Sequence, residues 1–291
     1  MKCIIAYGNE DDCLYIIDEQ GLNITRLRID YHEDDRIGIK TACAFEEILY
    51  AAGAIGDSLY AVDIKHRRLL YRTGAVGRHT VSLKAQGEFL YVCCNDTDTI
   101  NLVERNSGMP LISSHLGNCL TSIEVMGERC IVSSGESHEL KLLDALSLQE
   151  IASKQLNIMP VELLFDKENS CIFVCGSDAE NLGIVFMLDM QLNVLMQAHT
   201  GRQPIQMCLL KDNLLVLCMG DEVIAYHKRN NLKPYAWLKT PSSPTALCME
   251  ASKQIGYLLA GKQLCLLDIL GKIIIKKIPV PFEGTGILII E

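Results

Sequence analysis

The sequence predicts an all-β fold built from seven similar units of about 42 residues. A short apolar strand that closes on glycine or asparagine recurs at Gly8, Gly53, Asn95, Gly135, Gly176, Gly220 and Gly261. These closing positions are 45, 42, 40, 41, 44 and 41 residues apart. A second, alternating strand ends with nearly the same period at Asp18, Asp63, Glu104, Asp144, Asp189, His227 and Asp268. Two marks with a common period of this length predict a seven-bladed β-propeller.

Each unit divides into four antiparallel strands, which we name A to D. In the third unit they are expected at residues 80–84, 89–94, 100–104 and 110–114. The connections are short and carry Gly, Asn, Asp and Ser, which suit hairpin turns. Strand B is almost entirely apolar, as expected for a strand that neighbouring blades cover on both faces.

The two ends of the chain predict how the ring closes. The first unit begins with strand B at residues 2–7 and lacks a strand A. After the last strand D, residues 286–291 form one more apolar strand, similar to the other A strands. We expect it to pair with the N-terminal blade and close the ring, which protects the sheet edges. Residues 1–291 are therefore expected to form one propeller domain.

Composition excludes several classes of protein. Hydrophobic residues make up 49% of the chain and charged residues 22%, which is enough apolar surface for a core. The net charge of −9 disfavours binding to nucleic acid and to anionic membranes. No apolar run approaches the roughly 18 residues of a membrane-spanning helix, and the N-terminus lacks a signal sequence. The 13 cysteines, an odd number, indicate a reducing compartment. We therefore expect a cytoplasmic monomer without a cofactor.

The third unit carries a family resemblance. Residues 90–108, LYVCCNDTDTINLVERNSG, resemble the YVTN-type β-propeller repeat, in which Leu-Tyr-Val-x-Asn precedes a polar turn and an alternating strand. The segment from Gly201 to Pro204 resembles the Gly-x-x-Pro that often precedes strand A in such repeats. The resemblance implies a WD40-like propeller fold. Its members include binding modules, surface proteins, lyases and lactonases, and the many cysteines here disfavour an extracellular role.

Propeller ligands usually occupy the mouth of the central channel, on the face formed by the D–A and B–C loops. The predicted ligand-binding residues at this mouth are Arg36, Arg78, His79 and Arg202. Guanidinium groups bind carboxylate or phosphate through paired hydrogen bonds. The alternative is that these arginines offset nearby acidic residues or point into water. His79 is a candidate general acid or base, although a polar residue at the rim is the simpler interpretation.

The B–C loops are acidic, with twelve of the chain's 36 Asp and Glu residues. They are Glu10, Asp11, Asp12, Asp57, Asp96, Asp98, Glu136, Glu139, Asp178, Glu180, Asp221 and Glu222. The C–D loops on the opposite face are more basic. This polarity could steer a basic partner, or it could reflect the frequency of Asp in turns. Asp96 and Asp98 lack the remaining ligands of a calcium loop, so no metal is predicted.

Two other motifs are interpreted structurally. The segment from Gly256 to Lys262 resembles a phosphate-binding loop, but Gln263 replaces the required Ser or Thr and no helix is expected to follow. Cys171 and Cys175 share one face of a strand without a second ligand pair, which favours core packing over zinc.

The sequence thus predicts a non-catalytic scaffold that binds a protein, peptide or small anionic ligand at the channel mouth. The alternative is an enzyme similar to the propeller lyases or lactonases. It would use His79 as acid or base, and Arg36, Arg78 and Arg202 would hold an anionic substrate.

Overall fold

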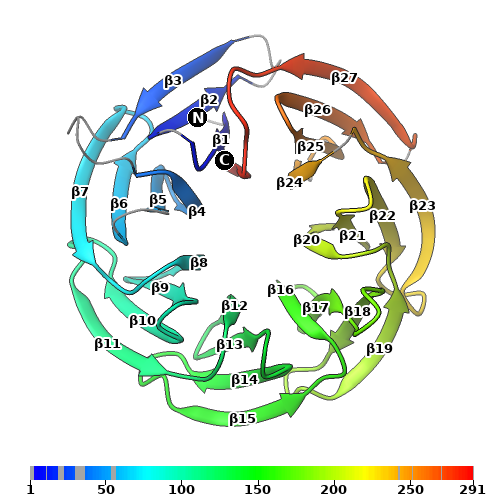
Figure 1. The fold of residues 1–291 in the computed structure, drawn as a ribbon, viewed down its shortest axis with the longest axis horizontal. Helices are drawn as coiled ribbons and strands as arrows, with labels where there is room; N and C mark the ends of the chain where they lie inside the picture. The colour runs from blue at the N-terminus through cyan, green and yellow to red at the C-terminus, as the bar shows by residue number, and fades with distance from the viewer. Residues whose placement is uncertain are drawn as a thin grey trace.

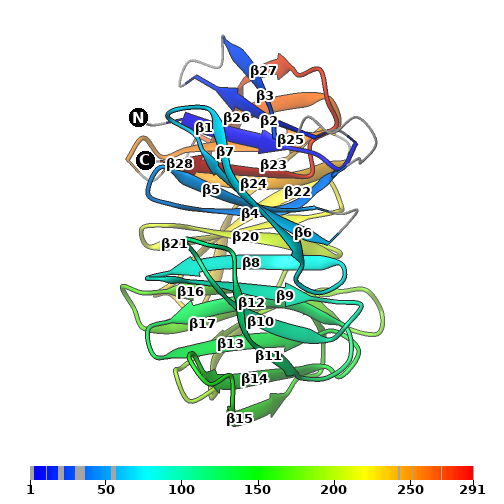
Figure 2. The same cartoon turned by 90° about the vertical axis from the view of Figure 1, so that its left-hand side faces the viewer.

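The computed structural model describes residues 3–10, 12–18, 23–29, 37–53, 57–241, 243–250, 252–269 and 271–290. These residues form seven four-stranded antiparallel sheets, arranged as the blades of a ring around a central channel (Figure 1). Figure 2 shows the same ring from its side. The predicted seven-bladed β-propeller is confirmed, and in each blade strand A lies innermost and strand D outermost.

The first four blades are named in the order in which the chain builds them, each from strand A to strand D. Blade 1 contains β28 (Gly286–Ile290), β1 (Cys3–Tyr7), β2 (Cys13–Ile17) and β3 (Ile24–Arg28). Blade 2 contains β4 (Ile39–Phe45), β5 (Ile48–Gly53), β6 (Ser58–Asp63) and β7 (Arg68–Ala75). Blade 3 contains β8 (Thr80–Gln86), β9 (Phe89–Cys94), β10 (Thr99–Glu104) and β11 (Pro110–His115). Blade 4 contains β12 (Leu120–Met126), β13 (Arg129–Ser134), β14 (Glu139–Asp144) and β15 (Glu150–Gln155).

The remaining three blades follow the same plan. Blade 5 contains β16 (Met159–Asp166), β17 (Cys171–Ser177), β18 (Gly183–Leu188) and β19 (Val194–His199). Blade 6 contains β20 (Pro204–Leu210), β21 (Asn213–Cys218), β22 (Glu222–His227) and β23 (Lys233–Lys239). Blade 7 contains β24 (Pro244–Glu250), β25 (Ile255–Ala260), β26 (Gln263–Asp268) and β27 (Ile273–Pro279).

The predicted ring closure is also confirmed. β28 supplies strand A of blade 1 and pairs antiparallel with β1, with Cys3 opposite Ile290 and Tyr7 opposite Gly286. Figure 1 shows the two chain ends side by side in this blade. A strand from the end of the sequence therefore completes the sheet that the first described residues begin.

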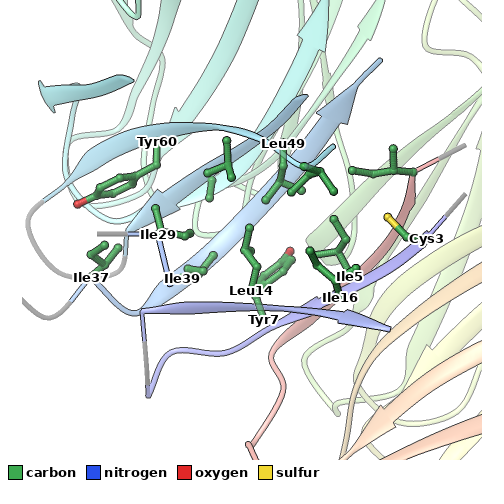
Figure 3. Packing of buried hydrophobic residues seen from close by; sticks show 14 residues of the cluster. Cys3, Ile5, Tyr7, Leu14, Ile16, Ile29, Ile37, Ile39, Leu49 and Tyr60 are labelled. Carbon is green, nitrogen blue, oxygen red and sulfur yellow. The ribbon is translucent and has the colours of Figure 1, made fainter. Parts of the chain in front are cut away.

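The core consists of seven apolar clusters, one between each pair of neighbouring blades. Figure 3 shows the cluster between blades 1 and 2, where Tyr7 and Leu14 approach Ile39 and Leu49. All five residues of β1 are buried, and the other B strands are buried almost throughout. This burial on both faces explains why the B strands lack the alternation of a half-exposed strand.

Candidate functional site

A polar cavity lies inside the channel near one face of the ring. Its volume is about 480 Å³, and all seven blades contribute to its wall. The lining comes mainly from the first halves of the innermost strands, together with Tyr7 of β1, Asn95 of a B–C loop and Thr285 of a D–A loop. The cavity therefore lies at the end of the channel formed by the D–A and B–C loops, as expected for a propeller ligand site.

Strand geometry determines which side chains reach this cavity. Six of the A strands carry a register irregularity near their start, and the residue just after it pairs with the end of strand B. We call this place the inner-edge position and include the matching residue of β28. All seven of these residues line the cavity: Thr41, Ser82, Ser122, Glu162, Gln206, Ala246 and Ile287.

Inner-edge side chains connect each blade to the next. Glu162 and Gln206 accept hydrogen bonds from the backbone N–H groups of Met207 and Leu247, the latter at 2.6 Å. Ser122 accepts one from the Leu163 N–H at 3.2 Å. Strand A is the edge of its sheet, so its channel-side N–H groups lack a strand partner. The polar side chain of the preceding blade supplies that partner.

Two ionisable groups of the cavity wall, Lys84 and Glu162, interact with each other and with Glu124. Lys84 donates a hydrogen bond to the carboxylate of Glu124 on the next blade. Burial lowers the pKa of Lys84, but the Glu124 carboxylate outweighs it and leaves the pKa raised. Burial raises the pKa of Glu162 to about 8, although Lys84 and the Met207 N–H oppose this. Near pH 7, Lys84 is therefore protonated and its positive charge is offset by the Glu124 carboxylate. Glu162 is mostly protonated and neutral at this pH.

Lys40 gives the cavity its net charge. It lies at the start of β4, is half-buried, and lines the cavity beside Thr41. Within the described part of the chain, its ammonium group forms no ion pair or hydrogen bond. The remaining polar lining is mainly hydroxyl and amide groups, including Asn95 and Gln206. The cavity thus combines one unpaired cation with neutral hydrogen-bonding groups.

The residues predicted from the sequence lie outside this cavity or cannot be placed. Arg36 lies outside the described residues. Arg78 and Arg202 are exposed on the D–A loops that lead into blades 3 and 6. Blades 4 and 5 lie between blades 3 and 6. Neither lines the cavity, and neither does His79. The structure brings His79 to Asp96, with 3.1 Å between Nδ1 and Oδ1, and shows no convergence of Arg78 with Arg202.

Several acidic residues of the B–C loops have structural roles. The carboxylate of Asp12 accepts hydrogen bonds from the backbone N–H groups of Ile37 and Gly38 on the next D–A loop. Asp57, Asp98 and Asp221 accept equivalent bonds from His79, Cys119 and Ser243. These four aspartates hold neighbouring loops together. Other acidic side chains of this face, Glu10, Asp96, Glu136 and Glu180, are exposed.

The basic residues of the opposite face are largely paired. Lys65 contacts Glu47 on the neighbouring A–B turn at 3.2 Å. Lys228 is almost completely buried and contacts Asp166 of the preceding blade at 2.6 Å. The basic C–D loops therefore meet acidic A–B turns, which the sequence analysis did not consider.

The two motifs interpreted structurally fall in strands. Gly256 lies in β25, and the turn at Gly261 leads directly into β26. Cys171 and Cys175 are buried with Phe173 in the cluster between blades 5 and 6. Across the described ranges, no three His, Cys, Asp or Glu side chains are grouped as metal ligands.

Comparison with known proteins supports the fold but gives no family. No family model matches the chain, and no curated protein matches it. Among solved structures, a chain described as Kuenenia stuttgartiensis Hydrazine Synthase is similar, with a TM-score of 0.74 and 12% identity. The match covers 88% of this chain and 92% of that one. At this identity the likeness shows a shared propeller fold alone, and the YVTN resemblance stays a prediction.

Sequence reasoning missed Lys40, Lys84 and Glu162. A signal was present, because Ser82, Ser122 and Glu162 follow one another at intervals of 40 residues. Aligning the A strands in the repeat would have placed them at one level of the channel. The position of the loop arginines at the mouth does not fix the direction of their side chains.

Proposed function

We propose that the protein is a non-catalytic binding scaffold whose site is the cavity beneath the D–A and B–C loops. Its ligand is a small anion, or an acidic side chain presented by a protein or peptide partner. The supporting observation is the unpaired ammonium group of Lys40 in a cavity otherwise lined by neutral or mutually paired polar groups. A partly buried cation attracts an anion more strongly than an exposed one, because water screens it less.

The proposed site favours anions under conditions that keep Glu162 protonated. Its pKa of about 8 means that the carboxyl becomes anionic as the pH rises above that value. The added negative charge would repel an anionic ligand from the same wall. Anion affinity is therefore expected to fall between pH 7 and pH 9.

Three proposals about the setting accompany this function. All 13 cysteines are free thiols, in keeping with a reducing compartment and the proposed cytoplasmic location. In the described part of the chain, no helix is long and apolar enough to cross a membrane. We also propose that the protein is a monomer. Like a WD40 propeller, it would bind its partner on the face formed by the D–A and B–C loops. The enzyme alternative relies on His79 acting with the arginines; among the described residues, the His79 ring contacts Asp96 and neither Arg78 nor Arg202.

Binding of acetate, succinate, citrate and inorganic phosphate can be measured by isothermal titration at pH 7. Lys40→Met is expected to weaken binding at least tenfold, since it removes the unpaired charge and keeps the length of the side chain. Lys65→Met, on the opposite face, is the matched control and should bind as the wild type does. Equal binding by wild type and Lys40→Met would refute the proposed site.

A further inference from the structure

A second pocket lies on the opposite face, between blades 3 and 4. Its volume is about 460 Å³. Phe89 and Tyr91 of β9 line it from blade 3, and Ala145 and Leu146 of a C–D loop line it from blade 4. Three carboxylates also belong to its lining, those of Glu88, Glu128 and Asp144, and no Lys or Arg does. The pocket thus combines aromatic surface with negative charge.

The same place in other blades is filled from within the chain. The first residue after strand C donates its backbone N–H to the A–B turn of its own blade, as in Arg105 to Glu88 and Ala145 to Glu128. Lys228 repeats this bond with Asp212, which establishes that the three residues are equivalent. We call this place the cleft position, because its side chain faces the preceding blade.

At the cleft position of blade 3, Arg105 fills the space between blades 2 and 3. Its guanidinium lies over the Phe45 ring at 4.2 Å from the centroid and donates a hydrogen bond to the Tyr50 hydroxyl at 3.2 Å. At the cleft position of blade 6, Lys228 reaches Asp166 of blade 5. Two clefts of this propeller therefore receive a cationic side chain from the following blade.

Blade 4 has Ala145 at the cleft position, so its side chain is too short to enter the corresponding space. Tyr91 occupies the place that Tyr50 has in blade 2, since the two pair with Lys84 and Cys43 at matching registers. Tyr91 is 1% exposed, and its hydroxyl makes no hydrogen bond to another described residue. Tyr91 lines the open pocket, where a ligand can supply a hydrogen-bond donor to its hydroxyl.

The carboxylates at this pocket supply the charge that a guanidinium requires. Glu88 and Glu128 are exposed, and their side chains form no ion pair with another described residue. Hydrogen bonds from Ser147 lower the pKa of Asp144, which is therefore anionic near neutral pH. Arginine binds such sites well because its flat, weakly hydrated guanidinium stacks on aromatic rings and bonds to carboxylates.

We propose that the pocket between blades 3 and 4 binds an arginine side chain of a partner polypeptide. The arginine takes the place that Arg105 occupies between blades 2 and 3 and donates to the Tyr91 hydroxyl. Gln86 stands at the register position of Phe45, so the ring against which the guanidinium lies is that of Phe89. The guanidinium pairs with Glu88 or Glu128. This site is independent of the anion-binding cavity, because it lies on the other face and shares no lining residue with it.

The test uses the full chain and three blocked tripeptides, acetyl-Gly-X-Gly-amide with arginine, lysine or citrulline at X, measured by titration. The arginine peptide is expected to bind at least tenfold more tightly than the citrulline peptide, which has the same shape without the charge. Glu128→Gln, an exposed substitution that leaves the core intact, should weaken arginine binding about fivefold or more. Equal binding of the three peptides, or of wild type and Glu128→Gln, would overturn the assignment.

A second variant places an arginine of the protein itself in the pocket. Ala145→Arg is expected to fill the pocket and reduce binding of the arginine peptide at least tenfold. Gln191→Arg is the matched control, because it adds the same charge at an exposed C–D loop of blade 5. Unchanged peptide binding by a folded Ala145→Arg protein would contradict the proposed position of the guanidinium.

Discussion

The two sides of the ring are joined by different kinds of contact. From blade 3 to blade 7, Ser82, Ser122, Glu162 and Gln206 each bond to a backbone N–H of the following blade. From blade 7 through blade 1, where the chain ends meet, the inner-edge residues are Ala246 and Ile287, which have no such group. Inner-edge side chains therefore join the blades by polar contacts on the first side, whereas on the second side they contribute apolar packing.

Apolar contacts replace the polar ones at the closing blade. Phe282 stacks on Tyr15 with 3.7 Å between ring centroids, and Ile287 packs in the same cluster. Polar contacts also occur here, from the Ala42 N–H to the Tyr7 hydroxyl at 3.1 Å and from the Thr245 hydroxyl to the Gly284 carbonyl at 2.6 Å. Polar contacts demand a fixed spacing, whereas apolar packing tolerates small shifts. The ring is therefore closed mainly by the burial of β28, whereas hydrogen bonds between innermost strands align the other blades.

The largest effect is expected from removing the closing strand. Truncation after Val280 deletes β28 and exposes the partners of Phe282, Ile287 and Ile290, all buried. Burial of each side chain contributes roughly 1.5–3 kcal/mol, so the loss approaches the whole stability of a typical domain. The truncated chain should lose its cooperative thermal transition. An unchanged midpoint would show that β28 does not close the ring.

The next largest effect concerns the polar side of the ring. Lys228→Ala leaves Asp166 buried without its cation, which costs about 3–5 kcal/mol. Arg229→Ala is the control, because its pair with Asp212 is exposed on both sides and such pairs contribute about 0–1 kcal/mol. Denaturant unfolding of the two variants should differ clearly. Equal losses would mean that burial of the Lys228–Asp166 pair does not matter.

The same pair gives a pH dependence. Burial acts to raise the pKa of Asp166, but hydrogen bonds from Lys228 and Asn169 outweigh it and the pKa is lowered. The pair therefore stabilises the fold above the ordinary pKa of 3.8, and the stabilisation is lost as the pH falls through the lowered value. Wild type should lose stability in this acid range, and Lys228→Ala should lose less.

Glu162→Gln is expected to have a smaller effect of opposite sign. Because folding raises the pKa of Glu162 from 4.5 to about 8, the wild type should lose stability as the pH rises through that interval. Glutamine cannot ionise and keeps an oxygen for the Met207 N–H. The variant should be more stable than wild type at pH 9, by on the order of 1–3 kcal/mol. Parallel pH–stability curves would contradict the pKa assigned to Glu162.

The smallest effect compares single hydrogen bonds on the two sides. Gln206→Ala removes the acceptor of the Leu247 N–H, and Tyr7→Phe removes the acceptor of the Ala42 N–H. Each should cost about 1 kcal/mol, the usual net contribution of such a bond. Amide hydrogen exchange should accelerate at Leu247 in the first variant and at Ala42 in the second. If hydrogen exchange became faster at both amides in either variant, the hydrogen bonds on the two sides of the ring would be coupled.

The architecture could be predicted from the sequence because the apolar strands and turn residues repeat along the chain with a regular period. The period around Gly53 and Asn95 predicted the blades, and the apolar residues 286–291 predicted the closing strand, found as Gly286–Ile290. The buried contact of Lys228 with Asp166 was missed because the two are 62 residues apart. The period places Lys228 in a C–D loop, but contacts between blades depend on side-chain direction as well as on the period.

The most direct test of this closure adds the missing strand back. A synthetic peptide of residues 281–291 is titrated into the chain truncated after Val280, and thermal unfolding is followed by circular dichroism. We expect the peptide to bind at one site and to restore a cooperative transition near that of the full chain. A peptide with Ile287→Asp and Ile290→Asp should not do so. Failure of the native peptide to bind, or equal rescue by both peptides, would contradict a ring closed by β28.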